Sequence, residues 1–431
     1  MVKEQPTWYE MQYIQDLMPI LNGKAVRGID TYYFLPDIYI GKSAVLKASR
    51  YLEAILNKEE RRALIITDSF TSKFVKKIEP FLNLIEMEFQ VWSGALAEVP
   101  INTIEEGVRV CESFKPTVLI AIGGGSVMDT AKGIMIKYEN PEENIHMVLA
   151  FSQTLGLRKK IKKFVAIPTT SGTGSEAARV AVLTDTNRDP PKKLIIAQDE
   201  LLADIAILDT DFVKDLPPFL TMATGLDALA HAMGAYTTNW GNPYTDSINL
   251  TTIKEIIKYL PRAYKYGAGD NEARSHMQVA STWAAFGANG NNNPGLNHGL
   301  GHSFGKVCGV HHGVSVIMFV PYTIAFKAKV TERWKDFCPI FGIDSGTKDD
   351  DALLHEFIHK LKDFIHSLDG PTCVKEIKEP VISKENYFNK MEILVDYAQN
   401  DAGSLTTYRP SNKELLRKIF EYAWDGKEID F

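Results

Sequence analysis

The sequence contains no apolar run long enough to cross a membrane, and its net charge is small. None of its 431 residues lies in a stretch approaching the roughly 18 apolar residues of a membrane helix. The N-terminal residues mix charged and aromatic side chains and lack the apolar region of a signal peptide. A net charge of −6 and a pI near 6.0 disfavour nucleic acid or an anionic membrane as a partner.

Cysteine is also scarce. The four cysteines are scattered, with no C-x-x-C pair, which argues against a disulfide framework and favours a reducing, cytoplasmic location. A composition of 45% hydrophobic and 24% charged residues is ordinary for a globular protein. Because hydrophobic cores stop growing at roughly 250–300 residues, a chain of 431 residues is expected to form two domains.

The first half of the chain alternates between strand and helix patterns. Short apolar runs predict strands at 38–41, 61–68, 84–92, 117–122, 163–168 and 205–209. Their solid apolar character predicts a parallel, Rossmann-like sheet covered on both faces. After about residue 212 the pattern becomes helical throughout. We therefore expect an α/β dinucleotide-binding domain at 1–212, with 1–33 as an extension, and an all-α domain at 213–431.

A strand, three glycines and a helix follow one another in "TVLIAIGGGSVMDTAK" (117–132). Glycine lets the backbone approach a ligand closely. Ser126 is expected to cap the helix, with Asp129 completing an imperfect capping box. The free N–H groups and the helix dipole then favour a pyrophosphate over Gly123, Gly124 and Gly125. The alternative is a tight turn that merely closes a strand–helix unit.

Two further strand ends carry polar side chains that would suit a dinucleotide. Asp68 follows an earlier strand, where a carboxylate accepts from a ribose 2′-hydroxyl and repels a 2′-phosphate. This favours NAD over NADP, although a solvated turn aspartate is the alternative. The second strand end, "IPTTSGTGSEA" (167–177), offers several hydroxyls, or is simply a polar loop. Its candidate residues are Thr169, Thr170, Ser171, Thr173 and Ser175.

Histidines and one aspartate of the second half suggest a metal site. Asp227 and His231 are four residues apart, which places both on one face of a helix. Four of the ten histidines lie within 295–313, at 298, 302, 311 and 312. One carboxylate with several imidazoles suits Fe, Zn, Mn, Co or Ni and leaves a position for a substrate oxygen. Because His311 and His312 are adjacent, we expect only one of them to face the metal. Alone, the Asp227–His231 spacing would more often be an ordinary surface or capping pair.

Four stretches together resemble the iron-containing (group III) alcohol dehydrogenases: "GGGSVMDTAK", "IPTTSGTGSEA", "ATGLDALAHAM" and "NHGLGHSFGKVCGVHHGVS". Their order and spacing agree with that family from about residue 34 to the C-terminus. The resemblance implies the fold shared with dehydroquinate synthase, in which a dinucleotide-binding domain and a helical metal-binding domain flank the active site. It also implies a homodimer or a larger homo-oligomer.

The resemblance assigns roles to the matching positions. The implied metal ligands are Asp227, His231, His298 and His312. His302 would be a histidine beside the nicotinamide and the substrate. Pyrophosphate would be held by Gly123, Gly124, Gly125 and Ser126. Thr169, Thr170 and Thr173 would line the cofactor. Lys193 would lie near the nicotinamide ribose, and Asp68 would discriminate NAD from NADP.

The chain departs from the family pattern at several points. Ser303 replaces a proline, and the segment "PINT" (100–103) puts Ile101 where an asparagine usually contacts the cofactor. His311 adds a second histidine beside an expected ligand. These departures leave the substrate and the cofactor preference open, but not the reaction class.

The expected function is metal-dependent, NAD(P)-linked hydride transfer between a nicotinamide and a small primary alcohol, diol or aldehyde. Fe²⁺ is the expected metal, with Zn²⁺, Mn²⁺ and Ni²⁺ as alternatives, and His302 would relay the proton. Alternatives within the superfamily are a glycerol dehydrogenase-like enzyme and a dehydroquinate synthase-like lyase. The lyase would need several lysines or arginines near the metal. The two histidine-bearing windows, 224–233 and 295–313, contain one such residue, Lys306. A non-enzymatic metal- or nucleotide-binding protein is the remaining alternative.

Overall fold

A computed structural model describes residues 7–12, 14–16, 35–148, 154–289, 293–344, 346 and 348–431. The chain divides into two compact units. The sheet unit contains Tyr33–Pro217 and Gly267–Phe286, and the helical unit contains Pro218–Tyr266 and Gly287–Phe431. The sequence analysis placed a single boundary at 212/213. In the structure the boundary lies at Pro217/Pro218, and residues 267–286 also belong to the sheet unit.

Six parallel strands form the central sheet, in the order β1-β8-β5-β4-β2-β3. They are β1 (Asp37–Ile40), β2 (Arg62–Ile66), β3 (Glu88–Trp92), β4 (Val118–Gly123), β5 (Lys163–Pro168) and β8 (Ile205–Leu208). Each corresponds to a strand expected from the sequence, so the predicted parallel α/β fold is confirmed. Strand β4 is buried at every position, as expected for a strand covered on both faces.

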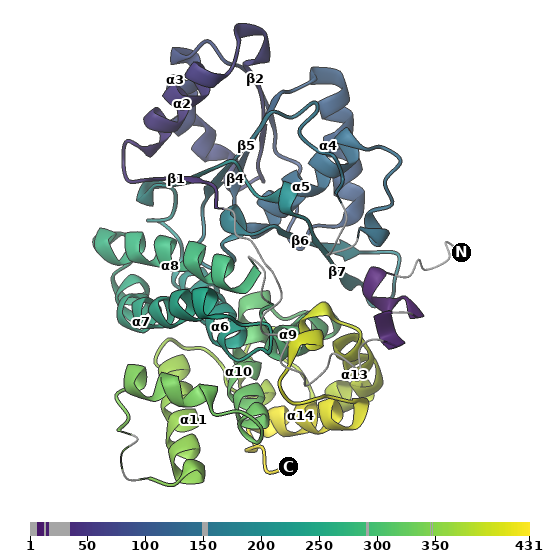
Figure 1. Ribbon diagram of the computed structural model, residues 1–431, viewed down its shortest axis with the longest axis vertical. Coiled ribbons are helices and arrows are strands. Elements are labelled where there is room, and N and C mark those ends of the chain that lie inside the picture. The colour runs from purple at the N-terminus through teal and green to yellow at the C-terminus, as the bar shows by residue number, and fades with distance from the viewer. Residues whose placement is uncertain are drawn as a thin grey trace. The chain divides into compact units, whose positions relative to one another are not determined.

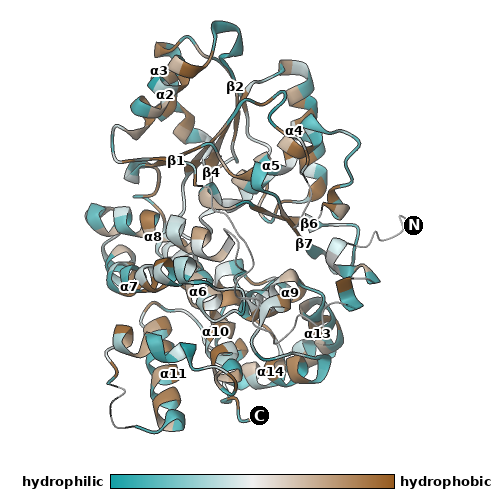
Figure 2. Cartoon of the chain, in the orientation of Figure 1, coloured by the Kyte–Doolittle hydropathy of each residue, from teal (hydrophilic) through white to brown (hydrophobic). Residues whose placement is uncertain are grey.

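Alternate residues of the strands face two separate apolar clusters. Leu64 and Leu119 belong to the cluster that also contains residues of α4 (Ile101–Phe114) and α5 (Gly125–Glu139). Ile65 and Ile120 belong to the cluster with residues of α2 (Ala44–Ile55) and α3 (Val75–Leu84). The period of two puts successive side chains on opposite faces. Figure 1 shows the two helix pairs on opposite sides of the sheet, and Figure 2 shows the strands as strongly hydrophobic.

An antiparallel hairpin lies between β5 and β8 in the sequence, where it interrupts the alternation of strand and helix. It was not predicted. It consists of β6 (Val180–Asp185) and β7 (Lys192–Ala197). Its inward side chains, Leu183 and Leu194 among them, join the apolar cluster beneath α4 and α5. The hairpin therefore extends the sheet unit beside α5, and it carries Lys193, one of the residues expected to contact the cofactor.

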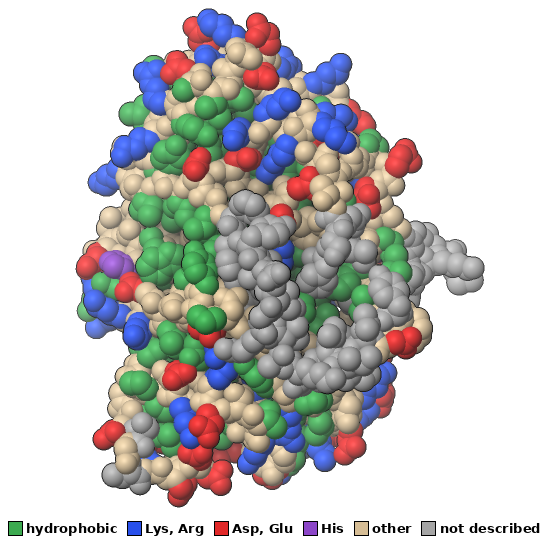
Figure 3. All heavy atoms as spheres, in the orientation of Figure 1, with side chains coloured by type: hydrophobic (Ala, Val, Ile, Leu, Met, Phe, Trp, Pro, Cys, Tyr) green, Lys and Arg blue, Asp and Glu red, His purple; other side chains and the backbone are tan. Residues whose placement is uncertain are grey.

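The helical unit contains the remaining long helices, which confirms the predicted all-α second part. They include α6 (Pro218–Tyr236), α7 (Pro243–Tyr266), α9 (Leu296–Cys308), α10 (His312–Ala328), α11 (Asp350–His366), α13 (Met391–Gln399) and α14 (Lys413–Asp425). Helix α8 (Asn271–Asn289) lies mostly in the sheet unit. Among the described residues, no helix is both long and apolar enough to span a membrane. On the face drawn in Figure 3, charged side chains of both signs are interspersed.

The histidine-rich window 295–313 forms α9 and the start of α10. Its glycines allow helices to approach closely. A Cβ at Gly301 would lie 2.8 Å from the Cα of Val316 in α10, and one at Gly299 would lie 2.2 Å from Ser404 Oγ. These glycines therefore bring the backbone that carries His298 and His302 close to neighbouring segments.

Candidate functional site

Three helices bring the four predicted metal ligands together. Asp227 and His231 come from α6, His298 from α9 and His312 from the first turn of α10. Asp227 Oδ1 lies 3.4 Å from His312 Nε2 and 3.7 Å from His298 Nε2. Ligand atoms of Asp227, His231 and His298 all lie within 4.8 Å of one another. We call these four residues the Asp–His cluster.

Two buried atoms of the Asp–His cluster show that it fits a cation. Asp227 is 2% exposed and His298 is 1% exposed. Within the described residues, neither Asp227 Oδ1 nor His298 Nε2 has a hydrogen-bond partner. Burying such polar atoms without a partner is costly. A divalent cation would satisfy both atoms at once, because carboxylate oxygen and imidazole nitrogen are its common ligands.

The protonation states of the Asp–His cluster also suit a cation. Burial lowers the pKa of His298 well below its usual value, and burial likewise lowers the pKa of His231. Burial alone would raise the pKa of Asp227, but the imidazoles of His231 and His312 hold that pKa well below its usual range. The ionised carboxylate of Asp227 and the neutral imidazoles of His231 and His298 are the forms that bind a metal ion.

A hydrogen bond orients the imidazole of His231, and an amide lies beside that of His298. His231 Nδ1 lies 2.9 Å from the backbone carbonyl of Asp227, to which it donates, and this leaves Nε2 for an ion. Asn297 Nδ2 lies 3.1 Å from His298 Nδ1 and 3.2 Å from the carbonyl of Ala230. Nothing in the sequence marks Asn297 except its position next to His298.

His302 lies beside the Asp–His cluster and is bonded to a carboxylate outside it. Its ring stacks on that of His312, with centroids 5.2 Å apart and planes 18° apart. His302 Nδ1 lies 3.0 Å from Asp401 Oδ2, and both residues are buried. Asp401 Oδ1 accepts from the backbone N–H of Gly403 at 2.7 Å. Asp401 was not predicted, because it lies 99 residues from His302 in no recognisable motif.

The two adjacent histidines diverge, as expected. His312 Nε2 faces Asp227, whereas the exposed ring of His311 meets Phe219 edge-on at 5.5 Å. Burial raises the pKa of the nearby Cys308 thiol to about 11. It is therefore a neutral thiol at physiological pH.

The glycine loop of the sheet unit connects β4 to α5, and one expectation about it is wrong. The helix begins at Gly125 with Gly124 as its N-cap, so Ser126 does not cap it and no capping box forms. Instead, Ser126 Oγ accepts from the backbone N–H of Glu98 at 3.3 Å. Asp129 accepts from Ser175 Oγ at 2.6 Å and from Val182 N at 2.9 Å. Both Asp129 oxygens therefore anchor neighbouring segments.

The threonines expected to line the cofactor lie against these glycines. A Cβ at Gly125 would lie 2.7 Å from Thr173 Oγ1, and one at Gly124 would lie 3.3 Å from Thr170 Cγ2. The backbone N–H of Thr169 donates to the last carbonyl of β4 at 2.9 Å. The structure thus brings the glycine loop and the threonine loop together, and at Gly125 only glycine leaves the required space.

A buried lysine anchors the threonine loop. Lys132 is fully buried on α5 and donates to Ser175 O, Ser175 Oγ, Ala178 O and Val180 O at 2.7–2.9 Å. Four acceptors compensate for the burial of this ammonium group. The sequence analysis gave Lys132 no role. Here it ties α5 to the segment that follows Thr173.

Asp68 and Lys193 also lie in the sheet unit. Asp68 Oδ1 accepts from Phe70 N at 2.8 Å and Thr71 N at 2.7 Å. Thr71 Oγ1 in turn donates to Ile122 O at 3.1 Å, which ties this turn to the strand that enters the glycine loop. Lys193 Nζ lies 2.6 Å from Glu98 Oε2.

Ile101, which stands where the family pattern has a cofactor-contacting asparagine, begins α4 and packs against the apolar cluster of the sheet unit. Glu98, three residues earlier, is the residue bonded to Ser126 and Lys193.

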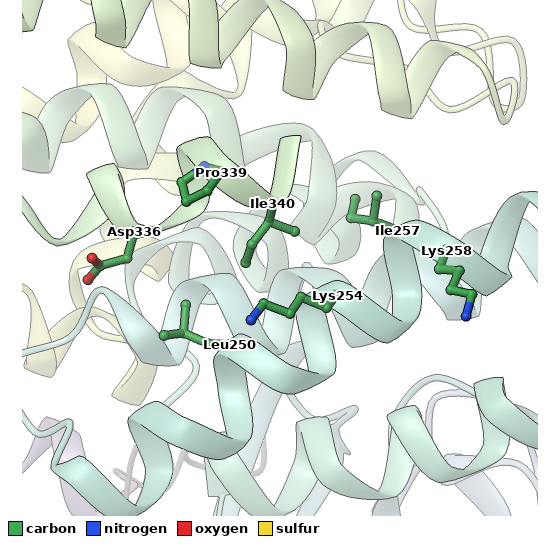
Figure 4. Close-up of a pocket in the computed structure, with 7 residues that line it drawn as sticks. All are labelled: Leu250, Lys254, Ile257, Lys258, Asp336, Pro339 and Ile340. Carbon is green, nitrogen blue, oxygen red and sulfur yellow. The ribbon is translucent and has the colours of Figure 1, made fainter. Parts of the chain in front are cut away.

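A separate hollow of about 510 Å³ lies in the helical unit, between α7 and η9 (Arg333–Phe341), and Figure 4 shows the side chains that line it. They are Leu250, Lys254, Ile257, Lys258, Asp336, Pro339 and Ile340. None of the predicted site residues is among them.

Known proteins resemble this chain over most of its length. Residues 36–210 match the family described as iron-containing alcohol dehydrogenase, and residues 221–424 match its C-terminal family. An NADPH-dependent butanol dehydrogenase of Clostridium saccharobutylicum is 31% identical over 92% of this chain and 98% of its own length. An aldehyde-alcohol dehydrogenase of Clostridium acetobutylicum is 28% identical over 81% of this chain, which spans 43% of that longer protein.

A solved structure gives the same result for the fold. An alcohol dehydrogenase from Oenococcus oeni superposes with a TM-score of 0.82 at 25% identity, over 92% of this chain and all of its own. The chain therefore belongs to the iron-containing alcohol dehydrogenase family and is an NAD(P)-linked alcohol oxidoreductase of that family.

Proposed function

We propose that the Asp–His cluster is the catalytic metal site of this enzyme and that Fe²⁺ is its preferred ion. The observation that carries this proposal is the pair of buried, unpartnered atoms, Asp227 Oδ1 and His298 Nε2, which face one another across 3.7 Å. The donor set of one carboxylate and three imidazoles suits Fe²⁺ as well as Zn²⁺, Mn²⁺ and Ni²⁺. The family description favours iron.

The remaining chemistry follows from residues of the chain. When bound, the cation supplies Lewis acidity at the substrate oxygen, and the nicotinamide accepts or donates hydride. His302 donates its Nδ1–H to Asp401, so its Nε2 is a proton acceptor. We assign to His302 the removal of the hydroxyl proton in alcohol oxidation and its return in aldehyde reduction. Asp401 is a positioning residue that fixes this tautomer.

The substrates we propose are small, linear primary alcohols and the corresponding aldehydes. Support comes from the butanol dehydrogenase that is 31% identical over nearly the whole chain. The test is a turnover assay on metal-free protein reloaded with Fe²⁺, Zn²⁺, Mn²⁺ or Ni²⁺, with a panel of alcohols and aldehydes and both nicotinamide cofactors. We expect the highest turnover with Fe²⁺ and primary alcohols. Metal-loaded, folded protein that oxidises no alcohol and reduces no aldehyde would contradict the proposal.

For the cofactor we propose NAD over NADP. Asp68 places a carboxylate after β2, next to the strand that leads into the glycine loop, where it would repel a 2′-phosphate. The NADPH dependence of the Clostridium saccharobutylicum relative makes this choice worth testing directly.

Replacing Asp68 with asparagine is expected to raise the ratio of kcat/KM for NADP to that for NAD by roughly tenfold or more, which is about 1.4 kcal/mol. Asparagine keeps an oxygen for the N–H groups of Phe70 and Thr71 and removes only the charge. The matched control is Asp349→Asn, since Asp349 caps α11 through the N–H of Ala352 in the helical unit. An unchanged ratio in Asp68→Asn would show that Asp68 does not select the cofactor.

A further inference from the structure

An exposed stripe of carboxylate and imidazole side chains runs along α11. Every fourth residue over three turns belongs to it: Asp351, His355, His359 and Asp363. This spacing puts all four side chains on one face of the helix. The opposite face is buried in the helical unit, where Phe357 packs against three aromatic rings. The backbone that carries the two histidines is therefore held in place.

Carboxylates contact both imidazoles through the same ring nitrogen. His355 Nδ1 lies 3.1 Å from Glu428 Oε2, and His359 Nδ1 lies 3.0 Å from Asp363 Oδ2. A carboxylate at one ring nitrogen is the arrangement that orients a metal-binding histidine and leaves the other nitrogen for the ion. Within the described residues, neither Nε2 has a partner. The two histidine side chains are 62% and 69% exposed, so both rings can turn toward a shared ion.

The sequence of this stretch matches a metal-binding pattern. Residues 355–359 read "HEFIH", which is the H-E-x-x-H arrangement in which two histidines one helical turn apart bind one metal ion. In metalloproteases the glutamate of this pattern is the general base. Here Glu356 pairs with Lys348, and both histidines are mostly exposed instead of lining a closed cleft. The pattern therefore indicates ion binding on α11 and not hydrolysis.

We propose that His355 and His359 form a second metal site, which binds a divalent transition-metal ion such as Ni²⁺, Cu²⁺ or Zn²⁺ between their Nε2 atoms. Imidazole nitrogen suits these ions, and water completes the coordination. The carboxylates of Asp351, Asp363 and Glu428 favour a cation on this face through their charge. Asp363 and Glu428 orient the rings and are not ligands. This proposal does not depend on the function proposed for the Asp–His cluster.

The second site is expected to hold its ion less tightly than the Asp–His cluster. It is exposed and offers two protein ligands in place of four. For a given set of donors, Fe²⁺ binds more weakly than Ni²⁺ or Cu²⁺. Fe²⁺ at a concentration that fills the Asp–His cluster should therefore leave His355 and His359 unoccupied. An ion bound by these two histidines should also be lost on gel filtration, so the metal content of desalted protein counts the Asp–His cluster alone.

The test counts the Ni²⁺ ions bound per chain at equilibrium, by dialysis of the full-length protein at neutral pH. His355→Ala and His359→Ala are each expected to bind one Ni²⁺ fewer than the wild type. Because both side chains are exposed, neither substitution should change turnover of the Fe²⁺-loaded enzyme or the Tm of the metal-free protein. An unchanged count in either variant would overturn the shared site, because one imidazole alone would not be the site proposed.

The matched control is His366→Ala. His366 is also an exposed histidine of α11, and its Nε2 lies 3.1 Å from Glu376 Oε2, but no histidine lies four residues from it in either direction. This variant should bind as many Ni²⁺ ions as the wild type. Loss of an ion in His366→Ala as well would show that Ni²⁺ binds to exposed histidines without regard to their spacing, and would overturn the proposal.

Discussion

Replacing Asp227 with alanine is expected to remove the bound divalent cation and the turnover together. Asp227 supplies the only carboxylate of the Asp–His cluster, and its Oδ1 faces His298 and His312. We expect kcat/KM to fall by roughly a thousandfold or more. A Lewis acid contributes several kcal/mol to a barrier, and each ~1.4 kcal/mol is a factor of ten in rate. Metal content by elemental analysis and turnover on the same sample give the two measurements.

Thermal unfolding provides a readout that does not depend on turnover. Added cation should raise the Tm of the wild-type protein, because binding to the folded state alone stabilises it, and should not raise the Tm of Asp227→Ala. The readout is the change in Tm on adding cation and not the Tm of the metal-free protein, because Asp227→Ala also removes a carboxylate whose ionised form the neighbouring imidazoles favour.

A matched control exists within the helical unit. Asp363 and His359 have the same four-residue spacing on α11, with Nδ1 and Oδ2 3.0 Å apart, but both side chains are more than half exposed. Asp363→Ala should therefore keep metal content, turnover and the cation-dependent Tm shift. Full metal content and full rate in Asp227→Ala would show that the ligand assignment is wrong.

The sequence placed two members of the Asp–His cluster together because their signal is local. A four-residue spacing places Asp227 and His231 on one helix face in any helix, whatever it packs against. His298 and His312 lie near Asp227 only because of tertiary packing. The family resemblance, and not a local pattern, predicted that these histidines would lie there. Asp401 and Asn297 carried no such signal. Their roles depend on which helices approach one another, and the glycines of α9 decide that only in three dimensions.

In the sheet unit the strands were easier to predict than the contacts of individual polar side chains. The six strands were predictable from apolar runs, but the polar contacts of the loops between them were not. Ser126 and Asp129 have the spacing of a capping box, yet the N-cap is Gly124, two residues earlier, and both side chains bond to neighbouring segments. The hairpin β6–β7 breaks the strand–helix alternation, so its link through Lys193 to Glu98 could not be anticipated.

Replacing Gly125 with alanine is expected to abolish tight dinucleotide binding while the protein remains folded. The added Cβ would lie 2.7 Å from Thr173 Oγ1 and 3.0 Å from Thr173 Cβ, so the short threonine side chain cannot simply rotate away. The threonine loop or the first turn of α5 must then shift. A shift of the N–H groups that hold a pyrophosphate should weaken NADH and ADP alike, by roughly 10–100-fold, because hydrogen bonds to charged groups contribute about 1.5–3 kcal/mol each.

Gly269→Ala is the matched control, because a Cβ there would meet no atom within 4 Å and Gly269 also belongs to the sheet unit. It should bind both ligands as the wild type does. Thr173→Gly combined with Gly125→Ala removes the clash and should recover part of the affinity for ADP. That recovery would show that the glycine is required for space against Thr173. If Gly125→Ala bound NADH normally, the glycine loop would not be the pyrophosphate site.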